Sequence, residues 1–203
     1  MGKKQVCKQL ANIDNLIYFS IENPIRCGSK DFSPIFVDFK KVLHCLNTRK
    51  SISSNLLKIV DKNIDSICGL ESGGNYYASC VADKLNKPVI FFRKNKKNFK
   101  NYNNEKRIAG NILNVKSIAL IDDVLATGLT AKDAIEYFKK YNISCHLYTI
   151  FTYGHNKAIS KKLNIKINSL ITFNDLAHYT NFLNENDIKI IKKHISNYNK
   201  YLK

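Results

Sequence analysis

The chain has 203 residues, of which 44% are hydrophobic and 24% charged, a composition typical of one folded globular domain. We predict a single domain over residues 1–203, because this length suffices for one well-formed core. No apolar stretch could span a membrane, and no signal-peptide core follows the amino-terminal lysines. The six cysteines have no C-x-x-C or zinc-finger spacing, which gives no support for a disulfide framework or a zinc site. Reduced thiols and a cytoplasmic location are expected.

The formal net charge is +17, a value that ordinarily suggests nucleic-acid binding. The lysine excess runs along the whole chain together with many asparagines and isoleucines, so it indicates a general bias more than a discrete basic patch. Two stretches concentrate charge, Arg93 to Arg107 and Lys189 to Lys203. Because polyanionic substrates also require positive charge, we do not expect nucleic acid to be the main partner.

The first half of the chain alternates between helical and extended patterns. Apolar spacing predicts a helix from about Lys4 to Phe19, and the proline and β-branched residues of Ser33 to Phe39 favour extended backbone. The elements expected next are a helix around Ser53 to Asp61, a strand from Ser66 to Leu70, a Gly73-Gly74 turn, a helix from about Asn75 to Leu85 and a strand from Val89 to Phe92.

The second half begins with Arg93 to Lys106, a polar run without periodicity that we interpret as a loop. The elements expected after it are a strand from Ile118 to Ile121, a helix to about Tyr141, strands from Cys145 to Phe151 and from Leu170 to Phe173, a helix from about Asp175 and a last helix capped by Asn184. This alternation predicts an α/β fold with a parallel sheet and with ligands at the carboxyl ends of its strands.

The segment from Asp122 to Thr130 carries the strongest chemical signal. Backbone N–H groups at the turn that opens a helix form a ready phosphate site, and Thr127, Gly128 and Thr130 occupy that turn. Asp122 and Asp123 can accept hydrogen bonds from sugar hydroxyls beside the phosphate. A phosphorylated ribose is therefore the simplest ligand, although an ordinary strand–turn–helix junction capped by Thr130 is the alternative.

Two further segments follow neighbouring strands. Glycines after Ser72 would let the backbone approach an anion closely, although a plain tight turn is the alternative reading. Arg93, Lys94 and Lys97 could neutralise a leaving group that carries several negative charges, and the polar run after them suits a lid that excludes water. A solvated charged loop is the alternative for this second segment.

Together these segments resemble a known family. Ile121 to Thr130 resembles the phosphoribosyl pyrophosphate (PRPP) motif of type I phosphoribosyltransferases, an acidic pair followed by T-G-G-T or a close variant. Asn23 to Gly28 and Ser33 to Asp38 are similar to the amino-terminal signature of the orotate phosphoribosyltransferases. Gly69 to Gly74 and Arg93-Lys94-x-x-Lys97 resemble two further loops of that family. The likeness keeps the expected order over nearly the whole chain.

The chain departs from the family pattern at several positions. Leu129 replaces the usual second glycine, Phe99 a usual histidine, and Ala126 a position that often carries Ser or Thr near orotate. Arg26 replaces a lysine and keeps its charge. Two alternatives therefore remain open: a purine-type phosphoribosyltransferase, and a PRPP-binding regulator of nucleic acid.

The resemblance implies a type I phosphoribosyltransferase fold, with a parallel sheet flanked by helices, a hood from about residues 1–40 plus C-terminal elements, and a flexible catalytic loop. It implies Mg²⁺-dependent transfer of ribose 5-phosphate from PRPP to orotate, giving orotidine 5′-monophosphate and pyrophosphate in UMP biosynthesis. It also implies a homodimer whose loop residues reach the partner's site.

The resemblance also assigns roles to individual residues. Lys97, Asp122 and Asp123 would be catalytic, and Mg²⁺ would be held mainly by PRPP and water. Orotate would lie against Arg26, Ser33, Phe36 and Ala126. PRPP would contact Ser72, Gly73, Gly74, Arg93, Lys94, Lys97, Asp122, Asp123, Val124, Leu125, Ala126, Thr127, Gly128, Leu129 and Thr130.

Overall fold

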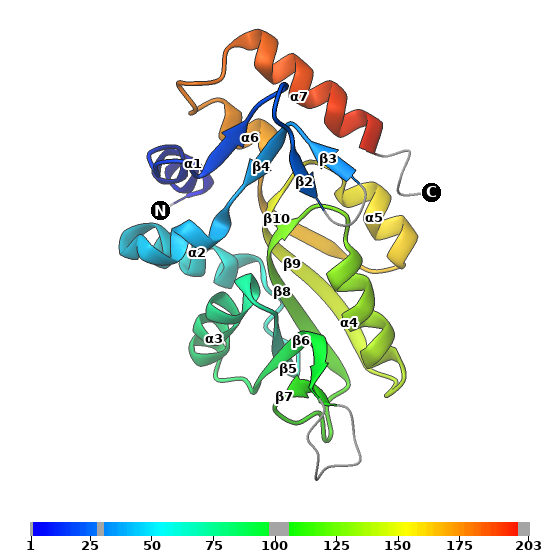
Figure 1. The fold of residues 1–203 in the computed structure, drawn as a ribbon. Helices are drawn as coiled ribbons and strands as arrows, with labels where there is room; N and C mark the ends of the chain where they lie inside the picture. Colours follow the sequence, from blue (N-terminus) through cyan, green and yellow to red (C-terminus); the bar gives the residue numbers. More distant parts are fainter. Residues whose placement is uncertain (1, 28–30, 98–105, 199–203) are drawn as a thin grey trace.

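The computed structural model describes residues 2–27, 31–97 and 106–198. A six-stranded sheet of order β10-β9-β8-β5-β6-β7 runs through the molecule (Figure 1). Adjacent strands are parallel except for the antiparallel pair β6 and β7. The strands are β5 (Ser66–Leu70), β6 (Val89–Lys97), β7 (Lys106–Ala109), β8 (Ser117–Leu125), β9 (Ser144–Thr152) and β10 (Ile167–Thr172). The predicted α/β class with a mostly parallel sheet is confirmed.

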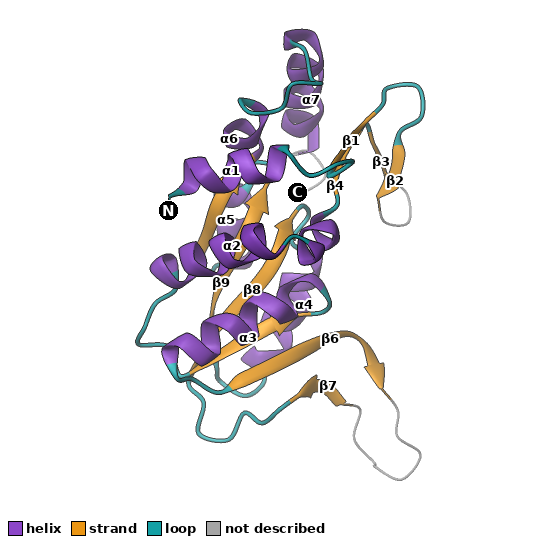
Figure 2. Cartoon of the chain, turned by 90° about the vertical axis from the view of Figure 1, so that its left-hand side faces the viewer, coloured by secondary structure: helices purple, strands orange, loops and turns teal. Residues whose placement is uncertain are grey.

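Helices cover both faces of this sheet (Figure 2). One face carries α1 (Lys3–Ala11), α2 (Leu46–Ile59) and α3 (Gly73–Leu85), and the other carries α4 (Leu129–Lys139) and α5 (Asn156–Leu163). Alternating residues of β8 enter two different cores: Ala119 and Ile121 pack on the α1–α3 side, whereas Ile118 and Leu120 pack on the α4 side. This two-sided burial explains why β8 has a continuous apolar run in the sequence.

A hood lies beyond one end of the sheet (Figure 1). It contains two small antiparallel pairs, β1 (Ile17–Phe19) with β4 (Ile35–Val37) and β2 (Ile25–Cys27) with β3 (Asp31–Ser33). The 3-10 helix η1 (Phe39–His44) leads from the hood to α2, and α6 (Phe173–Ala177) and α7 (Glu185–Tyr198) return to the hood after β10. Segments from both ends of the chain therefore meet above the sheet.

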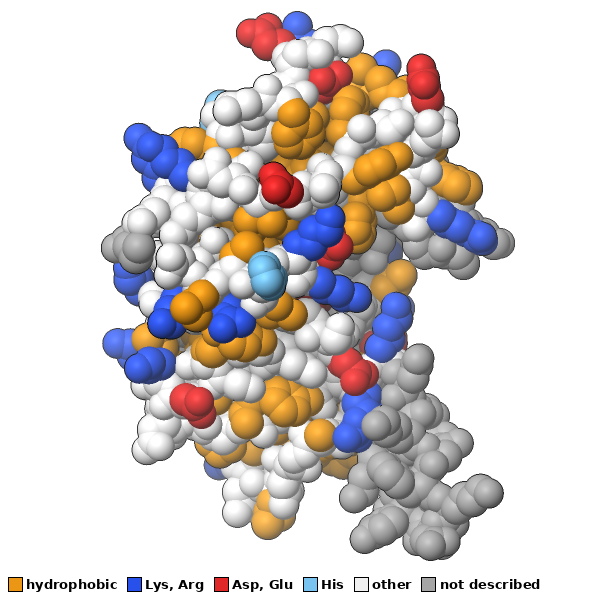
Figure 3. Space-filling model, turned by 60° about the vertical axis from the view of Figure 1, so that its left-hand side comes forward, with side chains coloured by type: hydrophobic (Ala, Val, Ile, Leu, Met, Phe, Trp, Pro, Cys, Tyr) orange, Lys and Arg blue, Asp and Glu red, His pale blue; other side chains and the backbone are white. Residues whose placement is uncertain are grey.

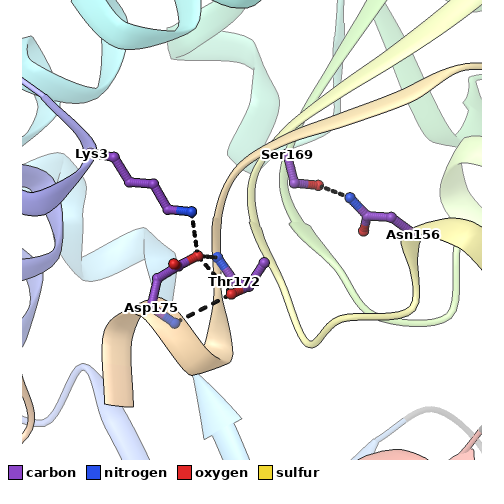
Figure 4. A network of polar contacts seen from close by, with 5 residues as sticks. All are labelled: Lys3, Asn156, Ser169, Thr172 and Asp175. Atoms are coloured by element: carbon purple, nitrogen blue, oxygen red, sulfur yellow. Dashed lines mark hydrogen bonds and ion pairs between the residues drawn. The ribbon is translucent and has the colours of Figure 1, made fainter. Parts of the chain in front are cut away.

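A polar network fixes the start of α6 (Figure 4). The Asp175 carboxylate accepts hydrogen bonds from the backbone N–H and the hydroxyl of Thr172, at 2.8 and 2.6 Å, and forms an ion pair with Lys3 at 2.7 Å. The Thr172 hydroxyl in turn accepts from the Asp175 N–H, which completes a capping box. Since Lys3 belongs to α1 and Thr172 ends β10, this network joins α1 to the junction between β10 and α6.

Several of the predicted element boundaries are wrong. The first helix ends at Ala11 and not near Phe19, because the chain turns at Asn15 with φ of 53° and Ile17 enters the core from strand β1. Helix α2 begins at Leu46 rather than Ser53, and α3 begins at Gly73 rather than after a Gly73-Gly74 turn. Helix α5 was not predicted at all.

A further wrong boundary is that of the expected loop that begins at Arg93. Its first part, up to Lys97, continues β6 and pairs with β7, with Lys97 opposite Lys106. The two strands form an arm that extends beyond the rest of the sheet (Figure 2). An arm of this kind needs no apolar alternation, so polarity alone could not identify it. Residues 98–105 of the expected lid lie outside the described residues.

Five of the six cysteines are among the side chains that the structure describes. Cys7, Cys45, Cys68, Cys80 and Cys145 are free. Burial, together with the nearby Asp175 charge, raises the pKa of the Cys7 thiol to about 11, and burial raises that of Cys145 to about 12. These two thiols therefore stay protonated and unreactive at neutral pH.

Candidate active site

A cleft of about 620 Å³ lies between the hood and the carboxyl end of β8. It brings together predicted site residues from both halves of the chain, because the topology folds the hood back over this edge of the sheet. The predicted residues that line it are Arg26, Ser33, Phe36, Lys94, Asp123, Val124, Ala126, Thr127, Leu129 and Thr130. The two segments predicted to hold the sugar phosphate and the base therefore face one cavity.

Asp122 and Asp123 lie on the last part of β8, which continues to Leu125 instead of ending at Ile121. Each carboxylate accepts the backbone N–H of the next residue, at 3.0 Å for Asp122 and 2.8 Å for Asp123. Asp123 lines the cleft, whereas Asp122 does not. Burial, and then the neighbouring Asp123 charge, raises the pKa of Asp122 well above its ordinary value. The pair is therefore asymmetric, with Asp123 the carboxylate that a ligand meets.

The turn after β8 has the geometry of an anion site. Gly128 adopts φ of 76° and is the N-cap of α4, while the Leu129 N–H donates to the Thr127 hydroxyl at 3.4 Å. The alternative reading, in which Thr130 caps the helix, is wrong because α4 already begins at Leu129. Leu129 and Thr130 both line the cleft, so the amino terminus of α4 faces it. Its N–H groups and helix dipole favour a bound anion there.

Gly73 and Gly74 serve close packing. A Cβ on Gly73 would collide with the Asp123 carboxylate, and one on Gly74 would collide with the Ile121 carbonyl oxygen. The first turn of α3 therefore packs directly against β8. Ser72, Gly73 and Gly74 are not among the residues that line the cleft. Their predicted contact with PRPP stays a prediction.

The three predicted cations are placed differently. Arg93 donates from Nη1 to the Ile108 carbonyl at 2.9 Å, which ties β6 to β7. Lys94 lines the cleft, and its backbone N–H donates to the Glu71 carboxylate at 3.3 Å. Lys97 ends β6, and its side chain lies outside the described part of the structure. Lys94 is thus the member of this group that the structure places at the cleft.

Sequence reasoning missed four residues of the cleft wall. Tyr153 and His155 follow β9, beside the end of β8, and His194 and Ile195 belong to α7. The position of Tyr153 and His155 at the carboxyl end of a parallel strand was the signal that could have identified them. The α7 residues carry no such signal, because their spacing is that of an ordinary amphipathic helix.

The described residues contain no group of three or more His, Cys, Asp or Glu side chains placed to hold a metal ion. No helix among them is long and apolar enough to cross a membrane. The carboxylates at the cleft nevertheless fit Mg²⁺, which usually keeps water and leans on substrate phosphates rather than on a full protein cage. Asp38, Asp123 and Asp133 are the carboxylates that line the cleft, and Asp123 is the one on the acidic pair of β8.

The open parallel sheet, its phosphate-type turn and the covering hood define an α/β protein that binds a phosphorylated sugar or nucleotide. The family model of the phosphoribosyl transferase domain matches residues 42–179, more than half of the chain. The chain therefore belongs to the phosphoribosyltransferases, a family of glycosyltransferases.

Individual relatives point to more than one base. The orotate phosphoribosyltransferase of Staphylococcus haemolyticus is 25% identical over 197 residues, covering 93% of this chain and 96% of that protein. The adenine phosphoribosyltransferase of Campylobacter hominis is 34% identical over 134 residues, covering 57% and 73%. A structure of Mycobacterium tuberculosis orotate phosphoribosyltransferase in complex with PRPP has a TM-score of 0.60 at 15% identity, covering 86% and 90%.

Proposed function

We propose that the protein transfers ribose 5-phosphate from PRPP to orotate, forming orotidine 5′-monophosphate and releasing pyrophosphate in UMP synthesis in the cytoplasm. The observation that carries this proposal is that one cleft is shared by the turn of α4 and by the hood strands β3 and β4, which contain Ser33 and Phe36 respectively. Relatives named as orotate phosphoribosyltransferases that match this chain over most of its length support the same choice of base.

The sugar phosphate is held by the turn between β8 and α4. The hydroxyls of Thr127 and Thr130 and the first N–H groups of α4 bind the 5′-phosphate. Asp123 accepts hydrogen bonds from the ribose hydroxyls. As the bond between the sugar and pyrophosphate breaks, positive charge develops on the ribose ring, and the Asp123 carboxylate stabilises that charge. The raised pKa of Asp122 limits repulsion between the two acids.

The leaving pyrophosphate carries its charge toward Lys94. Mg²⁺, when bound with PRPP, would add positive charge on the same oxygens. The hood covers the cleft and limits the access of water, which would otherwise compete with the base for the sugar cation. We include in the proposal that the β6–β7 arm, with Arg93 and Lys97, reaches the site of a second copy in a homodimer. Figure 2 shows this arm extending away from the sheet.

The base binds under the hood. Arg26 and Lys40 line this end and provide positive charge for the carboxylate of orotate, which adenine lacks. Phe36, which is 39% exposed, offers an aromatic face to a planar ring. The nitrogen of the base then attacks the anomeric carbon of the ribose as pyrophosphate leaves.

A purine base is the second candidate, and one observation favours it. Ala126 lines the cleft where a hydroxyl residue often lies near orotate, and the adenine-type relative has the higher identity, although over a shorter segment. The regulator alternative rests on the basic surface and on Phe99 with its extended loop, and residues 98–105 of that loop lie outside the described residues. Figure 3 shows Lys and Arg side chains in several places on one face, among acidic and hydrophobic ones, with a row of them along the right-hand edge.

The decisive experiment incubates purified protein with PRPP, Mg²⁺ and one base at a time. We expect loss of the ultraviolet absorbance of orotate and no consumption of adenine or hypoxanthine. Consumption of a purine with orotate untouched would refute the orotate assignment. Salt-dependent binding of nucleic acid without any consumption of PRPP would instead favour the regulator.

A further inference from the structure

The C-terminal helix α7 forms part of the wall of the cleft. His194 and Ile195, near the end of this helix, line the cavity together with hood residues that precede them in the chain by more than 150 positions. Figure 1 shows α7 lying across the hood strands. The C-terminal segment is therefore a candidate for a functional role beyond carrying positive charge.

Helix α7 is held firmly enough to place a side chain. At its start, the Asn184 side chain accepts from the Asp187 N–H at 2.9 Å, and Asp187 accepts from the Asn184 N–H at 3.0 Å, as the predicted cap requires. Ile191 is fully buried in the larger core, and Ile188 and Ile195 pack against the same core. This spacing fixes the rotation of the helix about its axis, so His194 has a defined position.

His194 shares the cleft with Arg26, Ser33 and Phe36 of the hood. Its helix lies across the hood strands (Figure 1), whereas the phosphate turn belongs to the sheet, between β8 and α4. We therefore assign His194 to the hood side of the cleft, where the proposed function places the base.

The chemistry of His194 suits a pyrimidine. Burial lowers the pKa of the imidazole, so the neutral ring predominates at neutral pH. A neutral imidazole presents one N–H donor and one acceptor nitrogen. The imide edge of a pyrimidine with two ring carbonyl groups, such as orotate, has the matching pattern, because its N–H group lies between two carbonyl oxygens.

We propose that His194 is a specificity-determining residue that hydrogen-bonds the polar edge of a pyrimidine ring held against Phe36, so that α7 closes the base subsite. The inference rests on the proposed function, because it assigns the base to the hood end of the cleft. A hydrophobic replacement of His194 would leave the buried polar edge of the base without a hydrogen-bond partner. We expect this loss to weaken binding of the base about tenfold.

The test compares His194→Leu and His194→Gln with His178→Leu. His178 is an exposed histidine that does not line the cleft, so its replacement is the matched control. We expect His194→Leu to raise KM for orotate about tenfold and to change KM for PRPP less than twofold. His194→Gln, which keeps a donor and an acceptor, should recover most of the affinity. An unchanged KM for orotate in His194→Leu, or an equal rise in both KM values, would overturn the inference.

A binding measurement separates this inference from the proposed function. Calorimetric titration with orotidine 5′-monophosphate and with ribose 5-phosphate requires no turnover. His194→Leu should bind the nucleotide about tenfold more weakly and ribose 5-phosphate as tightly as the wild type. Equal weakening of both ligands, or wild-type protein that binds the nucleotide no better than ribose 5-phosphate, would overturn the role of His194. Absence of orotate turnover in the wild type would count against the proposed function alone.

Discussion

The two ends of the cleft are built in different ways. The phosphate end comes from one contiguous segment, Asp122 to Thr130, in which strand β8 ends, a glycine adopts positive φ and helix α4 begins. The base end combines hood strands, the loop after β9 and helix α7, so its residues run from Arg26 to Ile195. A phosphate site formed by the backbone of one contiguous segment can therefore be recognised as a sequence motif. A base site formed by side chains that are distant in the sequence cannot.

This difference has a functional counterpart. Backbone N–H groups and a helix dipole bind any phosphorylated ribose, so the phosphate end can stay the same while the base changes. Side chains at the base end can be exchanged one at a time without disturbing β8 or α4. The match of this chain to both orotate and adenine relatives is the result expected of such an arrangement.

The largest effect should come from the acidic pair at the phosphate end. Asp123→Asn removes the carboxylate that faces the cleft, and we expect kcat to fall about 100-fold or more, because charge stabilisation in the transition state is lost. Unfolding in urea should show little change in stability. Asp14→Asn, at an exposed position outside the cleft, is the control. A fall in kcat that merely follows a loss of folded protein would remove Asp123 from the chemistry.

Asp122→Asn sharpens the same comparison, since Asp122 is the buried member of the pair. Its raised pKa means that the protonated form stabilises the fold, and that this contribution is lost as pH rises through the raised value. In the Asp122→Asn variant, the free energy of unfolding should therefore no longer show the fall with rising pH that Asp122 causes. At neutral pH this variant should be at least as stable as the wild type. Urea unfolding between pH 4 and about 8 measures this, and an unchanged slope would contradict the assignment.

A smaller effect is expected at the base end. Phe36→Ala removes an aromatic face from the cleft, and stacking of this kind is worth about 1–2 kcal/mol, so KM for the base should rise about tenfold. KM for PRPP should stay within about twofold, because the phosphate turn is untouched. Phe182→Ala, at a residue 56% exposed and outside the cleft, is the matched control. Equal changes in both KM values would show that the two ends are not separable.

The same contrast explains what could be predicted from the sequence. Strand β5 was predicted with its exact bounds, and the turn at Gly128 and the cap at Asn184 were also correct, because local backbone preferences determine all three. Arg93 was assigned to the leaving group, but its side chain bonds the Ile108 carbonyl across a strand pair that polarity did not reveal. His194 was missed because only the packing of α7 on the hood brings it to the cleft.

The smallest effect should come from the support of the base end. Asp175 caps α6, from which the chain continues to α7, and pairs with Lys3 (Figure 4). Burial alone would raise the pKa of Asp175, but the bonds from Lys3 and Thr172 together outweigh it and lower the pKa. Its stabilising contribution is therefore present above the ordinary value of about 4 and is lost as pH falls through the lowered one.

Asp175→Asn should cost about 1 kcal/mol in urea unfolding at pH 7, the usual value of a helix cap, and should raise KM for the base less than threefold. The difference from wild type should shrink in acid, once the pH has fallen through the lowered pKa of Asp175 and the native carboxylate is protonated as well. Asp14→Asn again serves as control. If the difference were the same at pH 7 and in acid, the ionised cap would not be its source. If KM for PRPP rose instead of KM for the base, α6 would support the phosphate end, and the division of the cleft would have to be redrawn.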